Sequence, residues 1–183
     1  MHESIKFPFD AAEQFNLGWN CAHGIGEEKN LEQAVFWYKK AAEQGHGDAQ
    51  CNLGIAYENG SGVEKDLNQA LYWYEQAAEQ GNAHAQCNLG IAYESAKGVH
   101  KNLNQAIFWF KKAAEQGNVI AQCNLGYSYA NSCGVNKNLE QAFFWYKKAA
   151  EQGNAIAQCY LGDAILNLSL IHISSPRDQR GSR

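Results

Sequence analysis

Apolar residues recur along the chain at the spacing of amphipathic helices. With a step of about 100° per residue, segment 48–59 places Ala49, Leu53 and Ala56 on one arc with Tyr57. The segment after Asp66 places a broader apolar set on an arc of roughly 160°: Leu67, Ala70, Leu71, Trp73, Tyr74, Ala77 and Ala78. The pattern predicts two consecutive helices joined by a short polar loop.

The same pair of helices recurs every 36 residues, as the steps from Leu17 to Leu53 and from Trp37 to Trp73 show. Internal repetition with such a period is typical of solenoid proteins. We expect a lead-in at 1–11, repeats at 12–47, 48–83, 84–119 and 120–155, and the first helix of a truncated fifth repeat at 156–165. The residues that mark the period are Leu17, Leu53, Leu89, Leu125 and Leu161, each followed by glycine, and Trp37, Trp73, Trp109 and Trp145.

Polar and glycine residues mark the ends of the predicted helices. Asn30 and its equivalents are typical N-caps, and a glutamine three residues later suits a capping box. Gly45 and its equivalents suit a left-handed helix end. In the loop, Gly26 recurs as Gly62, Gly98 and Gly134, whereas the position two residues earlier varies (Gly24, Gly60, Ala96, Ser132). We therefore expect only the later loop position to demand glycine.

A single helix pair cannot bury both of its apolar faces, so the repeats must stack on one another. Small residues allow the helices to approach closely, and tryptophan and tyrosine fill the space between them. The predicted fold is all-α, an α/α superhelical solenoid of helix–turn–helix repeats.

The repeated strings themselves resemble a known family. Ala-Gln-Cys-Asn-Leu-Gly-Ile-Ala-Tyr at 49–57, Gly-Ser-Gly-Val at 60–63 and Ala-Ala-Glu-Gln-Gly at 77–81 are similar to the Sel-1-like repeat, a relative of the tetratricopeptide repeat. The resemblance covers roughly residues 12–165. It implies a tetratricopeptide-like superhelix that acts as an adaptor or scaffold, frequent in bacteria and also found in eukaryotic quality-control complexes.

The cysteines separate this chain from one branch of that family. The disulfide-rich bacterial branch pairs a first-helix cysteine with one near the end of the second helix, where this chain has Ala-Ala in every repeat (for example Ala77 and Ala78). Four cysteines recur at one position of successive repeats, and we call them the ladder cysteines: Cys51, Cys87, Cys123 and Cys159. Two that are one repeat apart should lie ~10 Å from each other, too far for a disulfide. We expect six reduced, unpaired cysteines, and the hydrolase activity suggested for the disulfide-rich branch remains a rival function.

Composition and charge indicate which classes of partner to expect. The 183 residues carry a formal net charge of −4, and the three arginines (Arg177, Arg180, Arg183) all lie at the extreme end. Without a basic patch we expect no nucleic-acid partner. No apolar run is long enough for membrane insertion or a signal peptide, which favours a soluble, cytoplasmic protein, although a leader could lie upstream. We assign 166–183 to an unstructured or artefactual tail: its stretch 169–183 resembles translated adapter or linker sequence, and the alternative is a genuine polar tail.

Catalysis needs unlike groups that converge on one point, whereas this sequence repeats the same groups at fixed spacing. Glu58 and Glu94 should lie ~10 Å apart, beyond the usual range of paired carboxylates. His84 with Cys87, and Cys21 with His23, do not recur in other repeats, so we expect no metal site. We predict no enzyme activity, no cofactor and no specific small-molecule ligand.

The first helix has a face left over after packing. By resemblance to tetratricopeptide proteins this face lines a concave groove, and an asparagine before each Leu-Gly could bind the backbone of a peptide through its amide. The alternative is that each asparagine bonds locally or is merely tolerated. The candidate partner-binding residues on this face are Asn16, Trp19, Cys51, Asn52, Ile55, Glu58, Cys87, Asn88, Ile91, Glu94, Cys123, Asn124 and Tyr127.

A second candidate surface lies on the predicted convex side. Phe36, Tyr72, Phe108 and Phe144 project toward the polar side of the second helix, among lysines. Exposed apolar area can mark an interaction site, but each ring could instead fold over the adjoining repeat. The sequence thus predicts a protein–protein interaction scaffold that binds an extended or helical partner segment along the concave groove. The rival readings are the hydrolase and a purely structural segment of a longer array.

Overall fold

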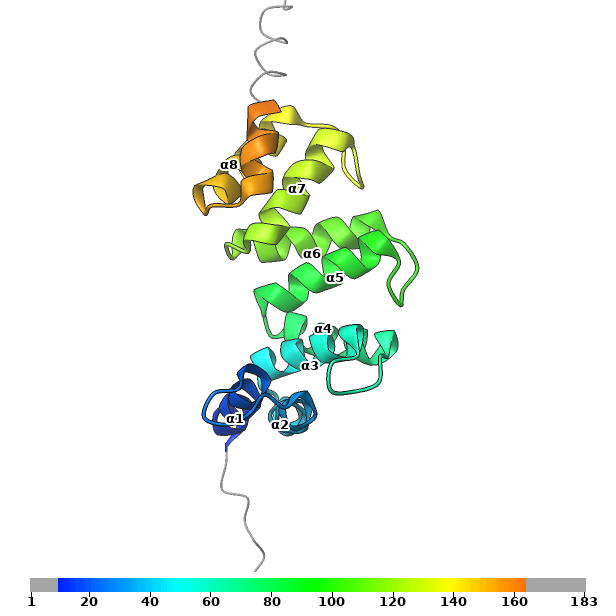
Figure 1. Ribbon diagram of the computed structural model, residues 1–183. Coiled ribbons are helices and arrows are strands. Elements are labelled where there is room, and N and C mark those ends of the chain that lie inside the picture. Colours follow the sequence, from blue (N-terminus) through cyan, green and yellow to red (C-terminus); the bar gives the residue numbers. More distant parts are fainter. Residues whose placement is uncertain (1–9, 164–183) are drawn as a thin grey trace, which may run out of the picture. The chain divides into compact units, whose positions relative to one another are not determined.

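The computed structural model describes residues 10–163, which are helical apart from short loops (Figure 1). A further helical stretch, 155–163, follows the labelled helices. The predicted all-α class and its pairing of helices are confirmed. The helices are α1 (Ala11–His23), α2 (Leu31–Glu43), α3 (Gly47–Asn59), α4 (Leu67–Glu79), α5 (Ala83–Ser95), α6 (Leu103–Glu115), α7 (Val119–Asn131) and α8 (Leu139–Glu151).

The predicted helix ends are confirmed, with one difference at the caps. Asn30 accepts a hydrogen bond from the backbone amide of Gln33 at 3.0 Å. The side-chain oxygen of Gln33, however, lies 3.8 Å from the thiol of Cys21 instead of closing a capping box. A complete box is formed by Asp10 and Glu13 at the start of α1, and its cap residue, Asp10, lies in the segment assigned above to a lead-in. The expected tail, 166–183, lies outside the described residues.

Both glycine positions of the loop between the two helices adopt left-handed backbone. Only the later one, represented by Gly62, requires glycine. Ala96 and Ser132 have φ values of 56° and 59°, so the earlier position tolerates a side chain in this conformation. At Gly62 an added Cβ would lie 2.2 Å from the carbonyl oxygen of Leu31, in the preceding repeat. A side chain there would collide with backbone, which explains the glycine.

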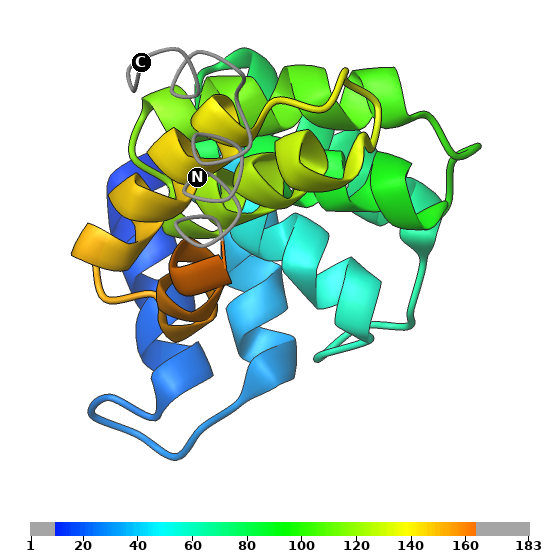
Figure 2. The same cartoon turned by 90° about the horizontal axis from the view of Figure 1, so that it is seen from above.

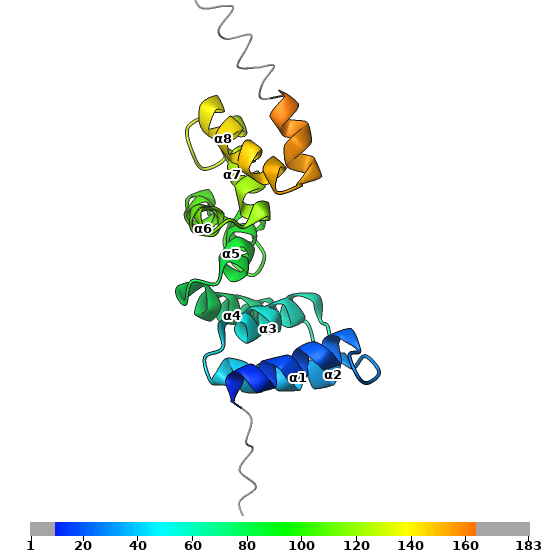
Figure 3. The ribbon, with the colours of Figure 1, turned by 90° about the vertical axis from the view of Figure 1, so that its left-hand side faces the viewer.

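Contacts divide the chain into two compact units, Met1–Leu89 and Gly90–Arg183, with the boundary inside α5. In the first unit α1 packs on α2, α3 packs on α4, and α2 also contacts α3 (Figure 3). The loop between α1 and α2 extends beyond the ends of both helices (blue in Figure 2). In the second unit α7 packs on α8 and on α6.

Each unit has a core in which alanines from facing helices allow close approach and aromatic rings fill the remaining space. In the first unit, Ala34, Ala41, Ala49 and Leu53 are buried with Tyr38 and Trp73. In the second unit, Ala142, Ala149 and Ala157 surround Tyr146. None of the helices in the described part of the chain is long and apolar enough to cross a membrane.

A network of buried glutamines, which the sequence analysis did not single out, links neighbouring repeats. The side-chain amide of Gln50 donates to the carbonyl oxygen of Ala42 at 3.2 Å. Its oxygen accepts from the amide of Gln80 at 2.7 Å. Gln122 forms the corresponding bonds in the second unit. The signal was present, because glutamine recurs before each ladder cysteine, but glutamine usually lies on the surface.

Candidate functional site

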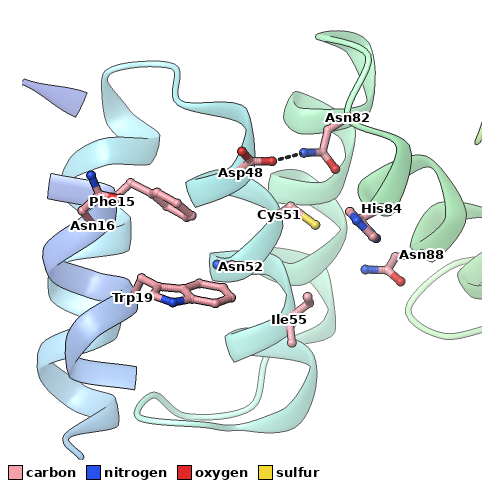
Figure 4. A pocket seen from close by; sticks show the side chains of 10 residues that line it. All are labelled: Phe15, Asn16, Trp19, Asp48, Cys51, Asn52, Ile55, Asn82, His84 and Asn88. Atoms are coloured by element: carbon pink, nitrogen blue, oxygen red, sulfur yellow. Dashed lines mark hydrogen bonds between the residues drawn. The ribbon is translucent and has the colours of Figure 1, made fainter. Parts of the chain in front are cut away.

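An open groove of about 600 Å³ runs across the first helices of successive repeats in the first unit (Figure 4). Helices α1 and α3 and the beginning of α5 form it. Six of the thirteen residues predicted for the partner-binding face line this groove, together with four others. The lining residues are Phe15, Asn16, Trp19, Asp48, Cys51, Asn52, Ile55, Asn82, His84 and Asn88.

Two aromatic rings from α1 form the apolar side of the groove. Phe15 and Trp19 point from α1 toward α3 (Figure 4). Phe15 stacks on His46, with ring centroids 4.7 Å apart, and Trp19 stacks on His23 at 4.0 Å. These contacts hold both rings in place while the indole of Trp19 stays 43% exposed. A preformed aromatic surface of this kind can accept an apolar side chain with little loss of conformational entropy.

The polar side of the groove is organised by the cap of α5. Asn82 accepts a hydrogen bond from the backbone amide of Ala85 at 2.9 Å. Its side-chain nitrogen donates to Oδ1 of Asp48, in the first turn of α3, at 2.7 Å. His84 and Asn88 point from α5 toward α3 (Figure 4). Asp48, Asn82 and His84 were not among the residues predicted for this site.

Two groove asparagines contact a tyrosine hydroxyl of the protein itself and keep hydrogen-bonding groups that a peptide could use. The amide of Asn52 lies against the hydroxyl of Tyr38, whose pKa burial raises and this contact lowers in part. Asn88 lies in the same way against Tyr74. These contacts support local bonding at both positions. An amide offers two donors and an acceptor oxygen, so one contact with a hydroxyl leaves capacity for a peptide.

The cysteines that recur in the first helices differ in burial. Cys51 and Cys87 are only 3% and 2% exposed, and burial raises the pKa of both thiols to about 12. Cys123 is also buried, whereas Cys159 is exposed, and all six cysteines are free. Cys51, Cys87 and Cys123 therefore expose little surface, although Cys51 lines the groove.

Two predicted glutamates, Glu58 and Glu94, differ in their surroundings. Glu58 accepts a hydrogen bond from the hydroxyl of Tyr74 at 2.7 Å, so its carboxylate is engaged within the repeat. Glu94 is half-buried, and burial raises the pKa of its carboxyl group while Lys101 lowers it in part. Ile91, Glu94, Asn124 and Tyr127 belong to the second unit.

The aromatic residues of the second candidate surface contact their own helices. Phe36, Tyr72, Phe108 and Phe144 each make an edge contact with the indole of the next residue, with ring centroids 4.9–5.1 Å apart. Lys112 lies 4.7 Å from the Phe108 ring centroid, and Lys148 lies 4.9 Å from that of Phe144. The rings are 43–50% exposed. These ring and lysine contacts lie within each helix.

The groove also brings together an acid, a histidine and a cysteine, which are residue types that nucleophilic catalysis uses. The thiol of Cys51 has a pKa raised to about 12 by burial and by the nearby charge of Asp48. A reactive cysteine needs the opposite shift, because the thiolate is the nucleophile. Cys51 therefore lacks the electrostatic activation that a nucleophilic thiol needs. Within residues 10–163, no group of three or more His, Cys, Asp or Glu side chains could hold a metal ion.

Comparison with known families identifies the repeat. The Sel1 repeat matches residues 14–46, 47–82, 83–118 and 119–154. The chain belongs to the Sel1 repeat family. A comparison with curated proteins found no match.

Solved Sel1 repeat structures have the same fold. The chain is 40% identical to c5321, a protective antigen of uropathogenic Escherichia coli with an SLR fold, over 84% of this chain and 33% of that one, with a TM-score of 0.80. It is also 40% identical to a Sel1 repeat protein from Oxalobacter formigenes, over 84% of this chain and 63% of that one, with a TM-score of 0.76. This chain thus spans less than two thirds of either relative.

A cysteine-rich Sel1-like relative is more distant. Helicobacter pylori cysteine rich protein B is 27% identical over 73% of this chain and 96% of that one, with a TM-score of 0.58. Of the alanines at the second-helix ends, Ala77 and Ala78 are buried in the core, as are their equivalents except Ala150, which is partly buried.

Proposed function

We propose that this Sel1 repeat chain is a protein-interaction scaffold that holds a segment of a partner protein in the groove of its first unit. The observation that carries this proposal is the open groove of about 600 Å³ across three successive repeats. Its lining combines side-chain amides with exposed apolar surface, the composition expected where a peptide backbone and its side chains are both bound.

Each kind of lining residue has a task in this proposal. Asn16, Asn52 and Asn88 bond the backbone of the segment, which they can do without reading its sequence because amides both donate and accept. Trp19 and Ile55 pack against the segment's apolar side chains, since they remain 43% and 38% exposed in the free protein. Asn16 is exposed and lies beside Phe15, so the α1 side of the groove has both functions.

The test compares two matched double variants. A partner is first captured with the whole chain, identified by mass spectrometry and made pure for calorimetry. The groove variant Trp19→Ala/Ile55→Ala and the second-helix variant Phe36→Ala/Tyr72→Ala each remove two exposed apolar side chains from the first unit. We expect the groove variant to weaken binding by at least about tenfold, as loss of an aromatic anchor does, and the other to change it little.

The opposite result would move the binding site to the second-helix aromatics, Phe36 and Tyr72. Unchanged affinity in both variants would mean that the captured partner binds at neither surface, and it would overturn the groove proposal. Circular dichroism of each variant checks that its helices are intact, so that a loss of binding is not a loss of folding.

A further inference from the structure

The groove lining carries an acidic side chain but neither a lysine nor an arginine. Asp48 is the one acidic residue among the ten that line it, and neither lysine nor arginine is among them. The Asp48 side chain is exposed at the groove wall, in the first turn of α3. A carboxylate in that turn also interacts favourably with the helix dipole, but this interaction leaves its surface open to a ligand.

The Asp48 carboxylate is held in one orientation with bonding capacity to spare. Oδ1 accepts from the amide of Asn82, which is itself fixed as the cap of α5. The hydrogen bonds and ion pairs formed within residues 10–163 do not use Oδ2. An oriented carboxylate with a free oxygen is suited to accept hydrogen bonds from an ammonium or guanidinium group.

An apolar surface lies in the same groove. Phe15 and Trp19 project from α1, and Ile55 lies on α3 (Figure 4). The groove thus offers one negative charge and one aromatic–aliphatic surface, with Asn52 between the two helices. This combination selects its occupant by charge as well as by shape.

We infer that the segment bound in this groove is an extended stretch of a partner protein that places a lysine or arginine side chain at Asp48 and a bulky apolar side chain on Trp19 and Ile55. This inference rests on the proposed function. The preference belongs to the first unit, because the positions equivalent to Asp48 in the second unit are Ile120 and Ile156.

Three pools of short acetylated peptides test the inference by calorimetry or fluorescence anisotropy. Each peptide carries one leucine or tryptophan and, a few residues away, one variable residue in a serine-rich background. The variable residue is arginine, its uncharged isostere citrulline, or glutamate. We expect the arginine pool to bind about fivefold more tightly than the citrulline pool at low salt, as one partly exposed ion pair allows. The glutamate pool should bind most weakly, and high salt should reduce the differences.

The decisive variant is Asp48→Asn, which keeps an oxygen to accept from Asn82 and removes only the charge. It should make the arginine and citrulline pools bind equally. Its matched control, Glu75→Gln, removes the same charge from an exposed position on α4 outside the groove and should keep the arginine preference. An arginine preference that survives Asp48→Asn overturns the inference, and so does failure of every pool to bind at millimolar concentration.

Failure of the charge preference can be distinguished from failure of the proposed groove function. If Trp19→Ala/Ile55→Ala weakens binding of the captured partner while Asp48→Asn leaves that binding and the peptide preferences unchanged, the groove function stands and the charge preference is wrong. If the groove variant has no effect on the captured partner, the proposed function fails first.

Discussion

A single tyrosine near the middle of a second helix holds several neighbours in place. The ring of Tyr74 packs against Gly54, where an added Cβ would lie 2.6 Å from the ring. Its hydroxyl donates to Glu58 and lies against Asn88. The next repeat has Glu94 at the position of Glu58, but phenylalanine, Phe110, at the position of Tyr74. The hydroxyl that serves Glu58 therefore has no counterpart for Glu94.

Glu94 should consequently make stability depend on pH. Burial raises the pKa of this carboxyl group in the folded protein, and the charge of Lys101 offsets only part of the shift. Between the unfolded and the folded pKa the folded state binds more proton, so stability falls as pH rises through that range. We expect Glu94→Gln to melt a little higher than the parent at pH 7.5 and no higher near pH 4, where the parent carboxyl group is protonated.

Thermal unfolding followed by circular dichroism at the two pH values measures this effect. The matched control is Glu115→Gln, which changes an exposed glutamate of the same unit. A similar shift for Glu94→Gln at both pH values would show that packing, and not ionisation, is responsible.

At the scale of the helix, glycines decide how closely the two helices of a repeat approach. Gly54 lies within α3 against the Tyr74 ring and the carbonyl oxygen of Ala70. Gly47, at the start of the same helix, has as its nearest neighbour the side-chain oxygen of Gln80, 3.9 Å from an added Cβ. The same substitution at these two positions should therefore have opposite effects.

We expect Gly54→Ala to destabilise the protein by about 1–2 kcal/mol, because overpacking outweighs the gain in helix propensity. Gly47→Ala should stabilise it by about 0.5–1 kcal/mol, since alanine fits the open position and restricts the unfolded chain. Urea unfolding of both variants measures the free energies. Stabilisation by both would mean that the helices separate at little cost.

The glutamine network acts between helices, and its loss should be costly. Gln50 is 4% exposed and bonds both Ala42 and Gln80. Gln50→Leu keeps the side-chain volume but removes both hydrogen bonds, each worth about 0.5–1.5 kcal/mol net. The Ala42 carbonyl and the Gln80 amide keep their other partners, Gly45 and Gln76, so no larger cost is expected. Gln158→Leu is the matched control, because Gln158 is exposed and makes only a long bond, 3.4 Å, to Ala150. Equal free energies of unfolding for the two variants would contradict this role.

The repeat pattern was enough to place the helices but not the bonds between them. Caps such as Asn30 and left-handed glycines such as Gly45 act through nearby backbone, so their positions predict α2 directly. The burial of Gln50 depends on a neighbouring helix pair, which periodicity alone does not describe. The Asp-x-x-Glu pattern at Asp10 was readable in the sequence and would have placed the start of α1 correctly.

The sequence likewise predicted some features of the candidate site and not others. Asn16, Trp19, Asn52 and Ile55, which the helical periodicity places on the leftover face of the first helix, line one groove. It could not show that Glu58 is bonded to Tyr74, because that contact depends on whether the second helix supplies a hydroxyl. Asp48 was not among the candidate residues, and no other repeat has an acidic residue at its position.

For the whole molecule, the division at Leu89 and Gly90 raises the question of whether the two units open together. In repeat proteins, stability is approximately a sum of repeat and interface terms, so one region can open before another. The ladder cysteines are natural reporters of this behaviour. Cys51 is buried in the first unit and Cys123 in the second, while Cys159 is exposed.

Thiol labelling should therefore show one fast cysteine and separate slow ones. In the folded, unreduced protein we expect Cys159 to react first, and Cys51 and Cys87 to react only on opening, because burial removes access and raises the pKa of their thiols to about 12. In denaturant all six should react. Fewer than six without added reductant would reveal a disulfide.

Two tryptophans then test the independence of the units. Trp73 in the first unit and Trp145 in the second are 9% and 8% exposed, and each has a buried indole nitrogen without a hydrogen-bond partner in the described chain. Either tryptophan-to-alanine change should cost about 3–5 kcal/mol within its own unit. Because the terms are local, Trp73→Ala should accelerate labelling of Cys51 far more than that of Cys123, and Trp145→Ala should do the reverse. Labelling followed by mass spectrometry of peptide digests gives both rates at once, and equal acceleration of both cysteines by either variant would show that the two units unfold as one cooperative block.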